Sequence, residues 1–435
     1  MKFRKETEFQ KTRIGEIPKE WKLEKLGRLV SYIKGRRPKR LYDEKLSEEF
    51  IPYLTAEYMR GLEKPKWCSP KEDPKVIRVQ YDDVIMIWDG SYSGHVFTGF
   101  EGVLASTMIK IFPSEEIDKR FLYYYLTKNF QKLRGTTVGT GIPHVNKKVF
   151  EELLIPLPSL NEQKRIAEIL LRVDNAIEGA DKAIVKLERL KRGLMSELLT
   201  GRIRVREENG RLSFHRETEL QETEIGKIPK EWGLAKLEKI AKIITGPFGS
   251  QLKKSELTNH GIKVYTQENV LERNFEIGNL YISEEKFKEL KNFEVMPDDV
   301  LLTIRGTIGK SIKVPTSITK GIIHTNLAII RLEKKEVLPD FVELVFNESE
   351  IWMEQVRRMY SATTIPALYG RTLKQIKIML PPLNEQKAIT HIFSTVNRAI
   401  ELYREEMTRL ERLKRGLMDL LLTGKVRVVD GDVGS

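Results

Sequence analysis

The feature that most constrains this chain is a segment that it carries twice. Residues 187–205 read LERLKRGLMSELLTGRIRV and residues 410–428 read LERLKRGLMDLLLTGKVRV, so that 15 of 19 positions agree. Chance does not produce such agreement, and a repeat of this kind indicates that one structural unit has been used twice. Any fold for this chain must therefore accommodate two similar halves.

Two further pairs of segments define the halves. TRIGEIPKEW, from Thr12, and TEIGKIPKEW, from Thr223, agree at 8 of 10 positions, and LPSLNEQK, from Leu157, recurs as LPPLNEQK from Leu380. The first pair is separated by 211 positions and the second by 223, so the second half carries 12 additional residues between its motifs. Each half therefore has an opening motif, a variable stretch and a closing segment.

The closing segments have the hydrophobic spacing of long helices. Apolar residues recur at alternating spacings of four and three, a seven-residue repeat that is typical of a coiled-coil seam. A helix of about 40 residues, roughly 60 Å long, needs an equally long partner, and the other copy supplies one. The alternative, a helix packed on its own domain, suits a single stripe better than two. The seam residues are Ile166, Leu170, Val173, Ile177, Ala180, Ile184 and Leu187 in the first copy and Ile389, Phe393, Val396, Ile400, Tyr403, Met407 and Leu410 in the second.

Local signals mark where these helices begin and end. Ser159 and Glu162 have the spacing of a capping box at the start of the first helix. Thr-Gly at 200–201 and 423–424 ends both helices, since glycine adopts a left-handed conformation at low cost. One interior glycine in each helix costs ~1 kcal/mol relative to alanine, and either a close approach of two helix backbones or a slight kink would account for it. These glycines are Gly193 and Gly416.

Between the motifs the two halves share a pattern rather than residues. Short β-prone segments bounded by turn-forming residues are followed by an amphipathic helical stretch and a loop of small residues. Each variable stretch is therefore predicted to be a mixed α/β domain. The expected strands are 53–57, 82–86 and 103–112 with equivalents 264–268, 298–302 and 324–332, the helices are 118–133 and 340–359, and the loops are 135–144 and 361–368.

The predicted fold class is α+β, with two mixed α/β domains separated by two long coiled-coil helices in a pseudo-two-fold internal repeat. The expected parts are an N-terminal segment 1–21, a first variable domain 22–157, a helix 158–201, a connector 202–222, a second variable domain 223–380, a helix 381–424 and a tail 425–435.

Composition narrows the class of function. The 75 Lys and Arg residues exceed the 62 Asp and Glu residues, and the net charge of +13 favours an anionic partner. No run of ~18 apolar residues and no signal peptide is present, so we expect a cytoplasmic protein without a membrane-spanning helix. The single cysteine, Cys68, excludes a disulfide framework and a cysteine-rich zinc site. The Lys/Glu-rich usage resembles that of thermophilic proteins.

Two similar frames that carry different loops on a basic chain suit a ligand with two separated, unlike half-sites. Duplex DNA is such a ligand, because phosphates supply affinity and base edges supply sequence information. The candidate contacts are polar and basic loop residues, although a surface charge run is often merely solvated. They are Lys34, Arg36, Arg37, Lys39, Arg40, Tyr92, Ser93, His95, Thr137, Thr140 and His144 in the first half and Ser250, Gln251, Lys253, Lys254, Arg305, Thr307, Lys310, Thr363 and Thr364 in the second.

No enzymatic motif competes with this interpretation. IRGTIGKS, residues 304–311, is a near match to the phosphate-binding loop GxxxxGK[ST], but Ile304 stands where the first glycine belongs. The six histidines show neither metal-ligand nor catalytic-triad spacing. We therefore predict no catalytic residue, no metal site and no bound cofactor on this chain.

The doubled IPKEW, LPxLNEQ and LERLKRGLM…LLTG motifs resemble those of the specificity subunit of type I DNA restriction-modification systems, over about residues 12–428. The resemblance implies two target recognition domains, each reading one part of a bipartite DNA sequence, and two antiparallel helices that set the gap between them. It also implies docking of two methylation subunits, with restriction subunits in the larger complex, and S-adenosylmethionine, ATP and Mg²⁺ on those partners only. The loop residues match the family in position only.

A second class of function stays open, namely a structural coiled-coil adaptor whose variable domains bind proteins. Salt discriminates the two classes. A DNA-binding protein that neutralises several phosphates loses affinity steeply as salt rises, whereas a mostly apolar protein contact does not.

Overall fold

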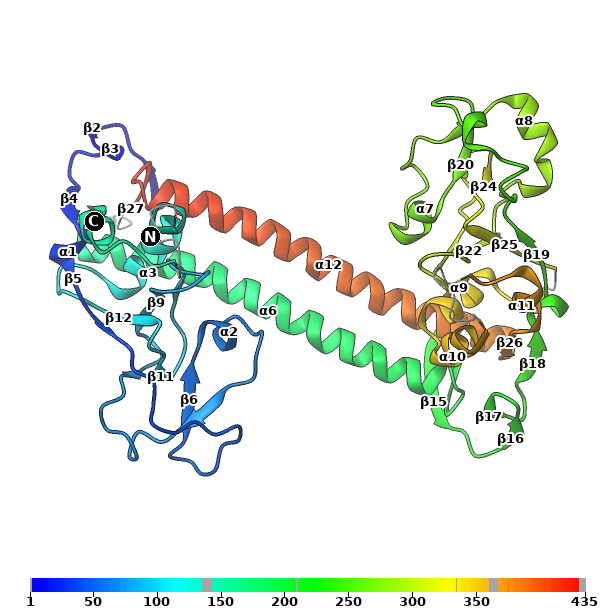
Figure 1. Ribbon diagram of the computed structural model, residues 1–435, viewed down its shortest axis with the longest axis horizontal. Coiled ribbons are helices and arrows are strands. Elements are labelled where there is room, and N and C mark those ends of the chain that lie inside the picture. Colours follow the sequence, from blue (N-terminus) through cyan, green and yellow to red (C-terminus); the bar gives the residue numbers. More distant parts are fainter. Residues whose placement is uncertain (1, 135–142, 209, 334, 360–366, 430–435) are drawn as a thin grey trace. The chain divides into compact units, whose positions relative to one another are not determined.

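The computed structural model describes residues 2–134, 143–208, 210–333, 335–359 and 367–429. The chain divides into two compact units, which we call unit 1, Met1–Lys182 with Arg404–Ser435, and unit 2, Ala183–Tyr403. The division falls inside both long helices (Figure 1). Each unit therefore contains one variable domain together with the beginning of one long helix and the end of the other.

The variable domain of unit 1 is built on two small sheets. Its strands are β5 (Val30–Lys34), β6 (Ile51–Leu54), β7 (Lys66–Cys68), β8 (Arg78–Val79), β9 (Val84–Ile87), β10 (Val96–Phe97), β11 (Gly102–Leu104) and β12 (Met108–Pro113), and its helices are α1 (Leu26–Leu29), α2 (Ala56–Met59), α3 (Lys119–Lys128), α4 (Phe130–Arg134) and α5 (Lys147–Glu152). The sheets have strand orders β10-β9-β12-β5 and β7-β6-β11-β8. Because successive residues point to opposite faces of a strand, Val84 and Met86 of β9 pack with the helices while Ile85 and Ile87 pack with the second sheet.

Unit 2 repeats this frame. Its strands are β19 (Ala241–Thr245), β20 (Ile262–Tyr265), β21 (Tyr281–Ile282), β22 (Val300–Thr303), β23 (Ser311–Lys313), β24 (Gly321–Ile323) and β25 (Leu327–Leu332), with helices α7 (Gln267–Leu271), α8 (Glu284–Glu289), α9 (Pro339–Glu348), α10 (Glu350–Met359) and α11 (Gly370–Gln375) and 3-10 turns at Leu237–Lys239, Lys254–Glu256 and Lys291–Phe293. The order β23-β22-β25-β19 matches that of the first sheet in unit 1, and β20 pairs with β24 in parallel as β6 does with β11. The expected mixed α/β frame is therefore present in both halves.

Several predicted elements are divided in the structure. The strand expected at 53–57 ends at Leu54, because the Thr55 hydroxyl accepts a hydrogen bond from the Tyr58 N–H and caps α2. The segment 103–112 is two strands in different sheets rather than one. The strand predicted at 324–332 is a single strand, β25, which begins at Leu327. The helix expected at 118–133 breaks at Asn129 and that at 340–359 breaks at Ser349, whose hydroxyl accepts from the Trp352 N–H. Polar side chains that bond to nearby backbone groups favour such helix ends.

The two long helices confirm the predicted coiled-coil seam. They are α6 (Leu160–Leu198) and α12 (Leu383–Leu421). Ile166, Leu170, Val173, Ala180, Ile184, Ile389, Phe393, Val396 and Ile400 are buried, and Ile177, Leu187, Met407 and Leu410 are partly buried. Tyr403 is the exception, because 42% of its surface stays exposed.

The helices run antiparallel. In unit 1 the beginning of α6 packs with the end of α12, since Ile166 and Leu170 share an apolar cluster with Leu421. In unit 2 the beginning of α12 packs with the end of α6, since Ile389 shares a cluster with Leu198. The start of each helix therefore lies against the end of the other.

The interior glycines of the helices do not mark a close helix contact. A Cβ added to Gly193 or Gly416 would meet no atom within 4 Å, so the expectation of a close backbone approach at these residues is wrong. Both lie on the exposed side of a continuous helix. The closing glycines do have the expected left-handed conformation, with φ +71° at Gly201 and +72° at Gly424.

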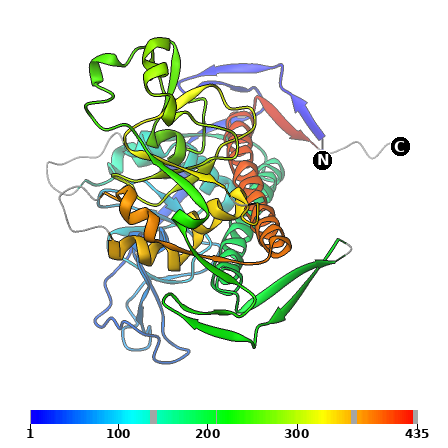
Figure 2. The same cartoon turned by 90° about the vertical axis from the view of Figure 1, so that its right-hand side faces the viewer.

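Short antiparallel ribbons surround the helix ends. They are β1 (Lys2–Lys5) with β27 (Val426–Val429), β2 (Phe9–Thr12) with β3 (Gly15–Pro18) and β4 (Lys22–Lys25) with β13 (Leu154–Leu157) in unit 1, and β14 (Ile203–Glu208) with β15 (Arg211–Arg216), β16 (Leu220–Thr223) with β17 (Gly226–Pro229) and β18 (Gly233–Lys236) with β26 (Lys377–Leu380) in unit 2. The blue and red strands of Figure 2 show that the chain's two ends form one ribbon, equivalent to the continuous hairpin β14–β15.

A buried arginine joins these ribbons to the helices in unit 1. The Arg427 guanidinium donates to both carboxylate oxygens of Glu162, at 2.8 Å each, and also to Glu6 and Glu20. The Trp21 indole N–H donates to the same Glu162 carboxylate at 3.3 Å. Such bidentate, charge-assisted bonds are among the strongest in proteins. We call this set of residues the unit 1 arginine cluster.

Unit 2 contains the same cluster. Arg204 donates to both oxygens of Glu385, at 2.8 Å each, and to Glu217 and Glu231, and the Trp232 indole N–H donates to Glu385 at 3.0 Å. Arg204, Glu385, Glu231 and Trp232 come from the same repeated motifs as their equivalents in unit 1, and Glu217, like Glu6, stands six residues before the opening motif. The repeated motifs therefore encode one joint, built twice.

The arginine cluster also changes the interpretation of the capping box. The Ser159 hydroxyl accepts from the Glu162 N–H as expected, at 3.3 Å, but Arg427 and Trp21 take the Glu162 carboxylate. Burial alone would raise the pKa of the neighbouring Glu6, but the Glu8 N–H and Arg427 outweigh it and lower that pKa to about 2. The Glu6 carboxylate is thus held in the charged form that pairs with Arg427.

We expect Arg427→Met to lower the free energy of unfolding by about 3–5 kcal/mol, because it leaves the buried carboxylates of Glu162 and Glu6 without their cation. Equilibrium urea unfolding measures this loss. Lys5→Met, which removes an exposed cation from the facing strand, is the control and should change stability little. A loss below about 1 kcal/mol for Arg427→Met would contradict the central role of the cluster.

Candidate nucleic-acid interface

In unit 1 the hairpin loop after β9, the loop after β5 and the loop before α5 lie close together at one end of the sheet β10-β9-β12-β5. The hairpin loop between β9 and β10, residues 88–95, is fixed on both sides by backbone bonds. The Asp89 N–H donates to the Thr107 carbonyl at 3.0 Å, the Gly90 N–H to that of Pro143 at 2.7 Å, and the Val145 N–H to that of Trp88 at 2.9 Å. This loop therefore carries Tyr92 and His95 on a firmly held backbone beside His144, with which Asp89 forms an isolated β-bridge.

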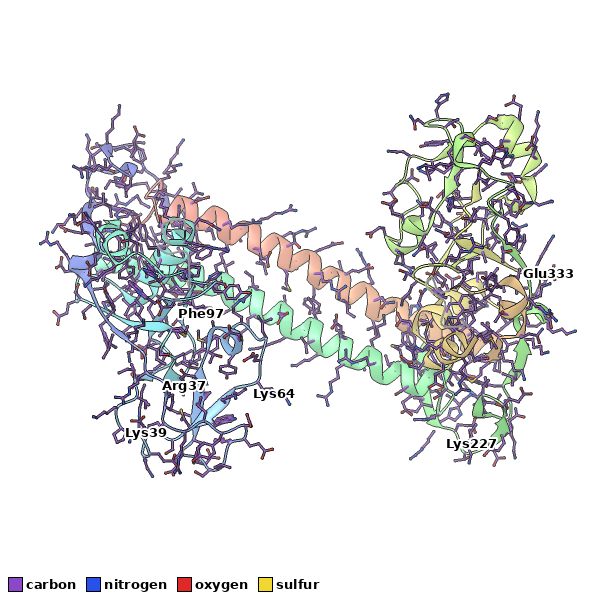
Figure 3. All side chains as sticks on the ribbon, in the orientation of Figure 1. Arg37, Lys39, Lys64, Phe97, Lys227 and Glu333 are labelled. Atoms are coloured by element: carbon purple, nitrogen blue, oxygen red, sulfur yellow. The ribbon has the colours of Figure 1, made fainter. Side chains whose placement is uncertain are left out.

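The basic loop after β5 lies next to the same hairpin. Lys34 forms an ion pair with Asp89, with its Nζ 2.7 Å from the carboxylate. A Cβ on the next residue, Gly35, would lie 2.1 Å from the Ala105 carbonyl oxygen, so only glycine fits where the loop crosses the sheet end. The following cations are exposed, and the described part of the chain offers none of them a carboxylate within ion-pair distance. They are Arg36, Arg37, Lys39 and Arg40, of which Figure 3 labels Arg37 and Lys39.

Two residues of this surface, Asp89 and Arg60, were missed by the sequence analysis. The Arg60 guanidinium stacks on the Tyr92 ring at 3.5 Å from its centroid, and so joins the end of α2 to the hairpin loop. His95 is held by Phe130, at a ring separation of 4.1 Å, and donates through Nδ1 to the Tyr92 carbonyl at 2.8 Å. The sequence placed Arg60 after a supposed strand, so nothing indicated this contact.

Unit 2 builds the equivalent surface with different residues. The Leu368 N–H donates to the Ile304 carbonyl at 2.8 Å, and Arg305 forms the isolated β-bridge with Ala367. These contacts correspond to those of Val145 with Trp88 and of Asp89 with His144. The hairpins of the two units are therefore held by equivalent bonds, although the loop of unit 2, residues 304–310, is one residue shorter than that of unit 1.

The remaining candidates of unit 2 are mostly exposed. Ser250, Gln251, Lys253, Lys254, Thr307 and Lys310 are exposed, and Arg305 is partly buried. A Cβ on Gly246 would lie 2.2 Å from the His324 carbonyl oxygen, which matches the crowding at Gly35. Burial, and then the charge of Arg305, lower the pKa of His324. A neutral imidazole therefore lies beside the Arg305 guanidinium.

Some predicted contacts do not lie on these surfaces. Ser93 has only 1% of its surface exposed, so its hydroxyl is not available to a ligand and it is removed from the candidates. Thr137, Thr140, Thr363 and Thr364 lie outside the described residues.

The near match to a phosphate-binding loop has the wrong setting. A phosphate-binding loop leads from a strand into a helix, whereas residues 304–310 lead from β22 into β23. Within the described ranges there is no cluster of three or more His, Cys, Asp or Glu that could hold a metal ion. A search of the same residues found no helix that is long and apolar enough to cross a membrane.

The sequence of this chain is similar to those of a known protein family. The family described as "Type I restriction modification DNA specificity domain" matches residues 18–189 and 229–412. The type I restriction enzyme MjaVIII specificity subunit of Methanocaldococcus jannaschii is 34% identical over 435 residues, which cover 98% of this chain and 98% of the relative. The EcoBI specificity subunit of Escherichia coli is 22% identical over 81% of this chain and 75% of its own length.

A solved structure shows a similar fold. The S subunit of a type I restriction-modification system from M. genitalium superimposes with a TM-score of 0.58 at 16% identity, over 92% of this chain and 96% of the other. Its fold matches the arrangement of two mixed α/β domains and paired long helices described above. The repeated motifs, the fold and the sequence relatives agree: this chain belongs to the family of type I restriction-modification DNA specificity subunits.

Proposed function

We propose that this chain is the sequence-specific DNA-binding subunit of a type I restriction-modification complex, and that each variable domain reads one half of a bipartite, asymmetric target. The domains that read would be residues 22–157 and 223–380. The observation that carries the proposal is the contrast within the repeat. Equivalent loops stand on equivalent frames, yet Asp89 and His95 in unit 1 are replaced by Arg305 and Lys310 in unit 2.

The exposed basic loop supports contacts to the phosphates. Phosphate contacts fix the position of a protein on the duplex, whereas base contacts select the sequence. In unit 1 the basic residues from Arg36 to Arg40 would contact phosphates, and the hairpin loop beside them would contact bases. In unit 2 Lys253, Lys254 and Lys310 would act on phosphates near Arg305.

The helices would set the gap between the two half-sites and dock two methylation subunits. Residues 187–195 and 410–418 are identical at all nine positions, although the stretches before them, 179–186 and 402–409, agree at none. The seam requires only the inward residues to match. Four exposed positions match as well, which supports a partner that binds both copies in the same way. They are Arg189, Leu190, Arg192 and Gly193, with equivalents Arg412, Leu413, Arg415 and Gly416.

In this proposal the chain has no catalytic role and works in the cytoplasm, where the DNA is. S-adenosylmethionine, ATP and Mg²⁺ would be bound by the methylation subunits and by the restriction subunits of the full complex. The alternative, an adaptor whose variable domains bind proteins, is less favoured. Phe248 and Tyr369 are exposed on the surface of unit 2, but the exposed cations of the two surfaces outnumber such apolar groups.

Exchange of one domain tests the proposal directly. Replacing residues 22–157 by the equivalent domain of a relative should change one half of the methylated target and leave the other half intact, because unit 1 and unit 2 have separate cores. The boundary keeps the paired strands β4 and β13 together. Methylation mapping reads both halves, and a change in both at once would contradict one domain per half-site.

The salt dependence of DNA binding tests the phosphate contacts. Neutralising Arg36, Arg37, Lys39 and Arg40 to Gln should weaken binding and reduce the slope of log K against log salt by about 0.9 for each lost contact. The matched control neutralises Lys25, Lys45, Lys71 and Lys119, four exposed lysines of the same unit that already have carboxylate partners. Equal slopes for the two variants would show that net charge alone matters and that the basic loop does not contact DNA.

Assembly tests the role of the helices. The isolated chain should transfer no methyl group from S-adenosylmethionine to DNA, and it should support transfer once methylation subunits are added. Leu190→Glu with Leu413→Glu should reduce the number of subunits bound, measured by analytical ultracentrifugation. Val185→Glu with Leu402→Glu, at exposed apolar positions outside the identical segments, is the control and should assemble normally. Methyl transfer by the isolated chain, or normal assembly of the first variant, would count against the proposal.

A further inference from the structure

We propose that Asp89 and Arg305 are specificity-determining residues that occupy the same position in the two recognition domains. Asp89 accepts a hydrogen bond from the exocyclic amino group of a cytosine or adenine, and Arg305 donates to a guanine. The inference rests on the proposed function and adds to it the base chemistry of one position in each half-site.

The equivalence of the two positions follows from the backbone. Asp89 and Arg305 each follow the strand that precedes the hairpin loop, each forms the isolated β-bridge to the loop before α5 or α11, and each is followed by a glycine with positive φ. The residues facing them are His144 and Ala367. One backbone position therefore presents a carboxylate in unit 1 and a guanidinium in unit 2.

The Asp89 carboxylate is available for a further hydrogen bond. Its side chain is 23% exposed, and among the described residues one oxygen is bound by Lys34 at 2.7 Å. A carboxylate has about four acceptor positions, so acceptor capacity remains. Lys34 also cancels the charge that nearby phosphates would repel, which makes a carboxylate tolerable on a DNA-facing surface.

The backbone around Arg305 is fixed by a different residue, Gln267. With its amide oriented to suit both neighbours, Gln267 donates to the Arg305 carbonyl at 2.7 Å and accepts from the Thr307 N–H at 3.1 Å. No carboxylate among the described residues forms an ion pair with Arg305. The backbone of Arg305 is therefore fixed, while its guanidinium N–H groups remain available as donors. Two of these N–H groups can bind the O6 and N7 acceptors of guanine.

The residue at the end of the strand beside Asp89 or Arg305 also differs between the two units. Lys34 lies opposite Ile109 and its equivalent, Thr245, lies opposite Ala328 in the same register. The domain with the carboxylate thus has a lysine beside it, and the domain with the arginine has a neutral residue. An arginine next to DNA needs no neighbouring cation, whereas a carboxylate does. The presence of Lys34 beside Asp89 and of Thr245 beside Arg305 therefore agrees with a role for Lys34 in neutralising Asp89.

An exposed ion pair that only supports the loop is the competing explanation for Lys34 and Asp89. Such a pair would contribute little to stability and nothing to the choice of base. The two explanations separate when the readout is the base preferred at each position of the target rather than overall affinity.

The experiment uses the full chain assembled with its methylation subunits and a library of targets randomised at each specified base. For Asp89→Ala, which removes the acceptor oxygens, we expect the preference at one position of the first half-site to fall by roughly 5- to 150-fold, and for Arg305→Gln a similar fall at one position of the second. Arg305→Lys keeps a donor and should retain guanine. Asp82→Ala, which breaks the ion pair with Lys119 in the same unit, is the matched control and should alter no position.

A gain of function gives an independent test. Lys34→Thr with Asp89→Arg installs the unit 2 pair in unit 1 and should shift the affected position of the first half-site towards guanine. Unchanged preferences in Asp89→Ala, in Arg305→Gln and in the double variant Lys34→Thr with Asp89→Arg would overturn the inference while leaving the proposed function standing. A uniform loss of binding with preferences intact would do the same. A wild-type complex that selects no bipartite target would instead overturn the proposed function itself.

Discussion

The bidentate pairing of a buried arginine with the glutamate at the start of a long helix is the interaction on which the rest of each unit depends. Arg427 with Glu162 and Arg204 with Glu385 each join three parts of the chain: a helix start, the strand after the other helix, and the IPKEW motif through its tryptophan. Because both charges are buried, neither can be lost alone without leaving the other uncompensated. The joint therefore fixes how a recognition domain is seated on the helix pair of its own unit.

The same joint explains why some segments of the two halves are nearly identical while others differ. Residues that build it are nearly identical in the two halves, and each closing glycine packs against the proline and tryptophan of the motif, as Gly424 does against Pro18 and Trp21. The hairpin and basic loops contribute nothing to the joint. Trp88, Ile304 and Leu252 anchor these loops in the apolar clusters, but their exposed polar residues lie outside the clusters. They are therefore free to differ, and they do so in charge as well as size. A constant support with replaceable reading loops is what a protein needs when its target must change without its assembly changing.

The sequence was informative where local patterns decide structure. Seven-residue spacing, Thr-Gly stops and short hydrophobic runs predicted both helices to within three residues at each end. They also placed β-prone segments where β6, β9 and β12 and their equivalents β20, β22 and β25 lie. It failed where distant residues decide. Glu162 looked like half of a capping box because its real partners, such as Arg427, lie 265 positions away, and Arg60 was overlooked because its role depends on Tyr92 in another loop. Ser93 resembled its exposed neighbours in sequence, and only the folded hairpin shows that it points inward.

The central claim is that one chain reads two unlike half-sites with two equivalent surfaces. Genome-wide methylation mapping tests it most directly, in a host without other modification systems that expresses this chain with its methylation subunits. The account predicts a single asymmetric motif of two specified segments separated by unspecified bases of fixed number. A continuous motif, a palindromic motif, or methylation without sequence preference would contradict it.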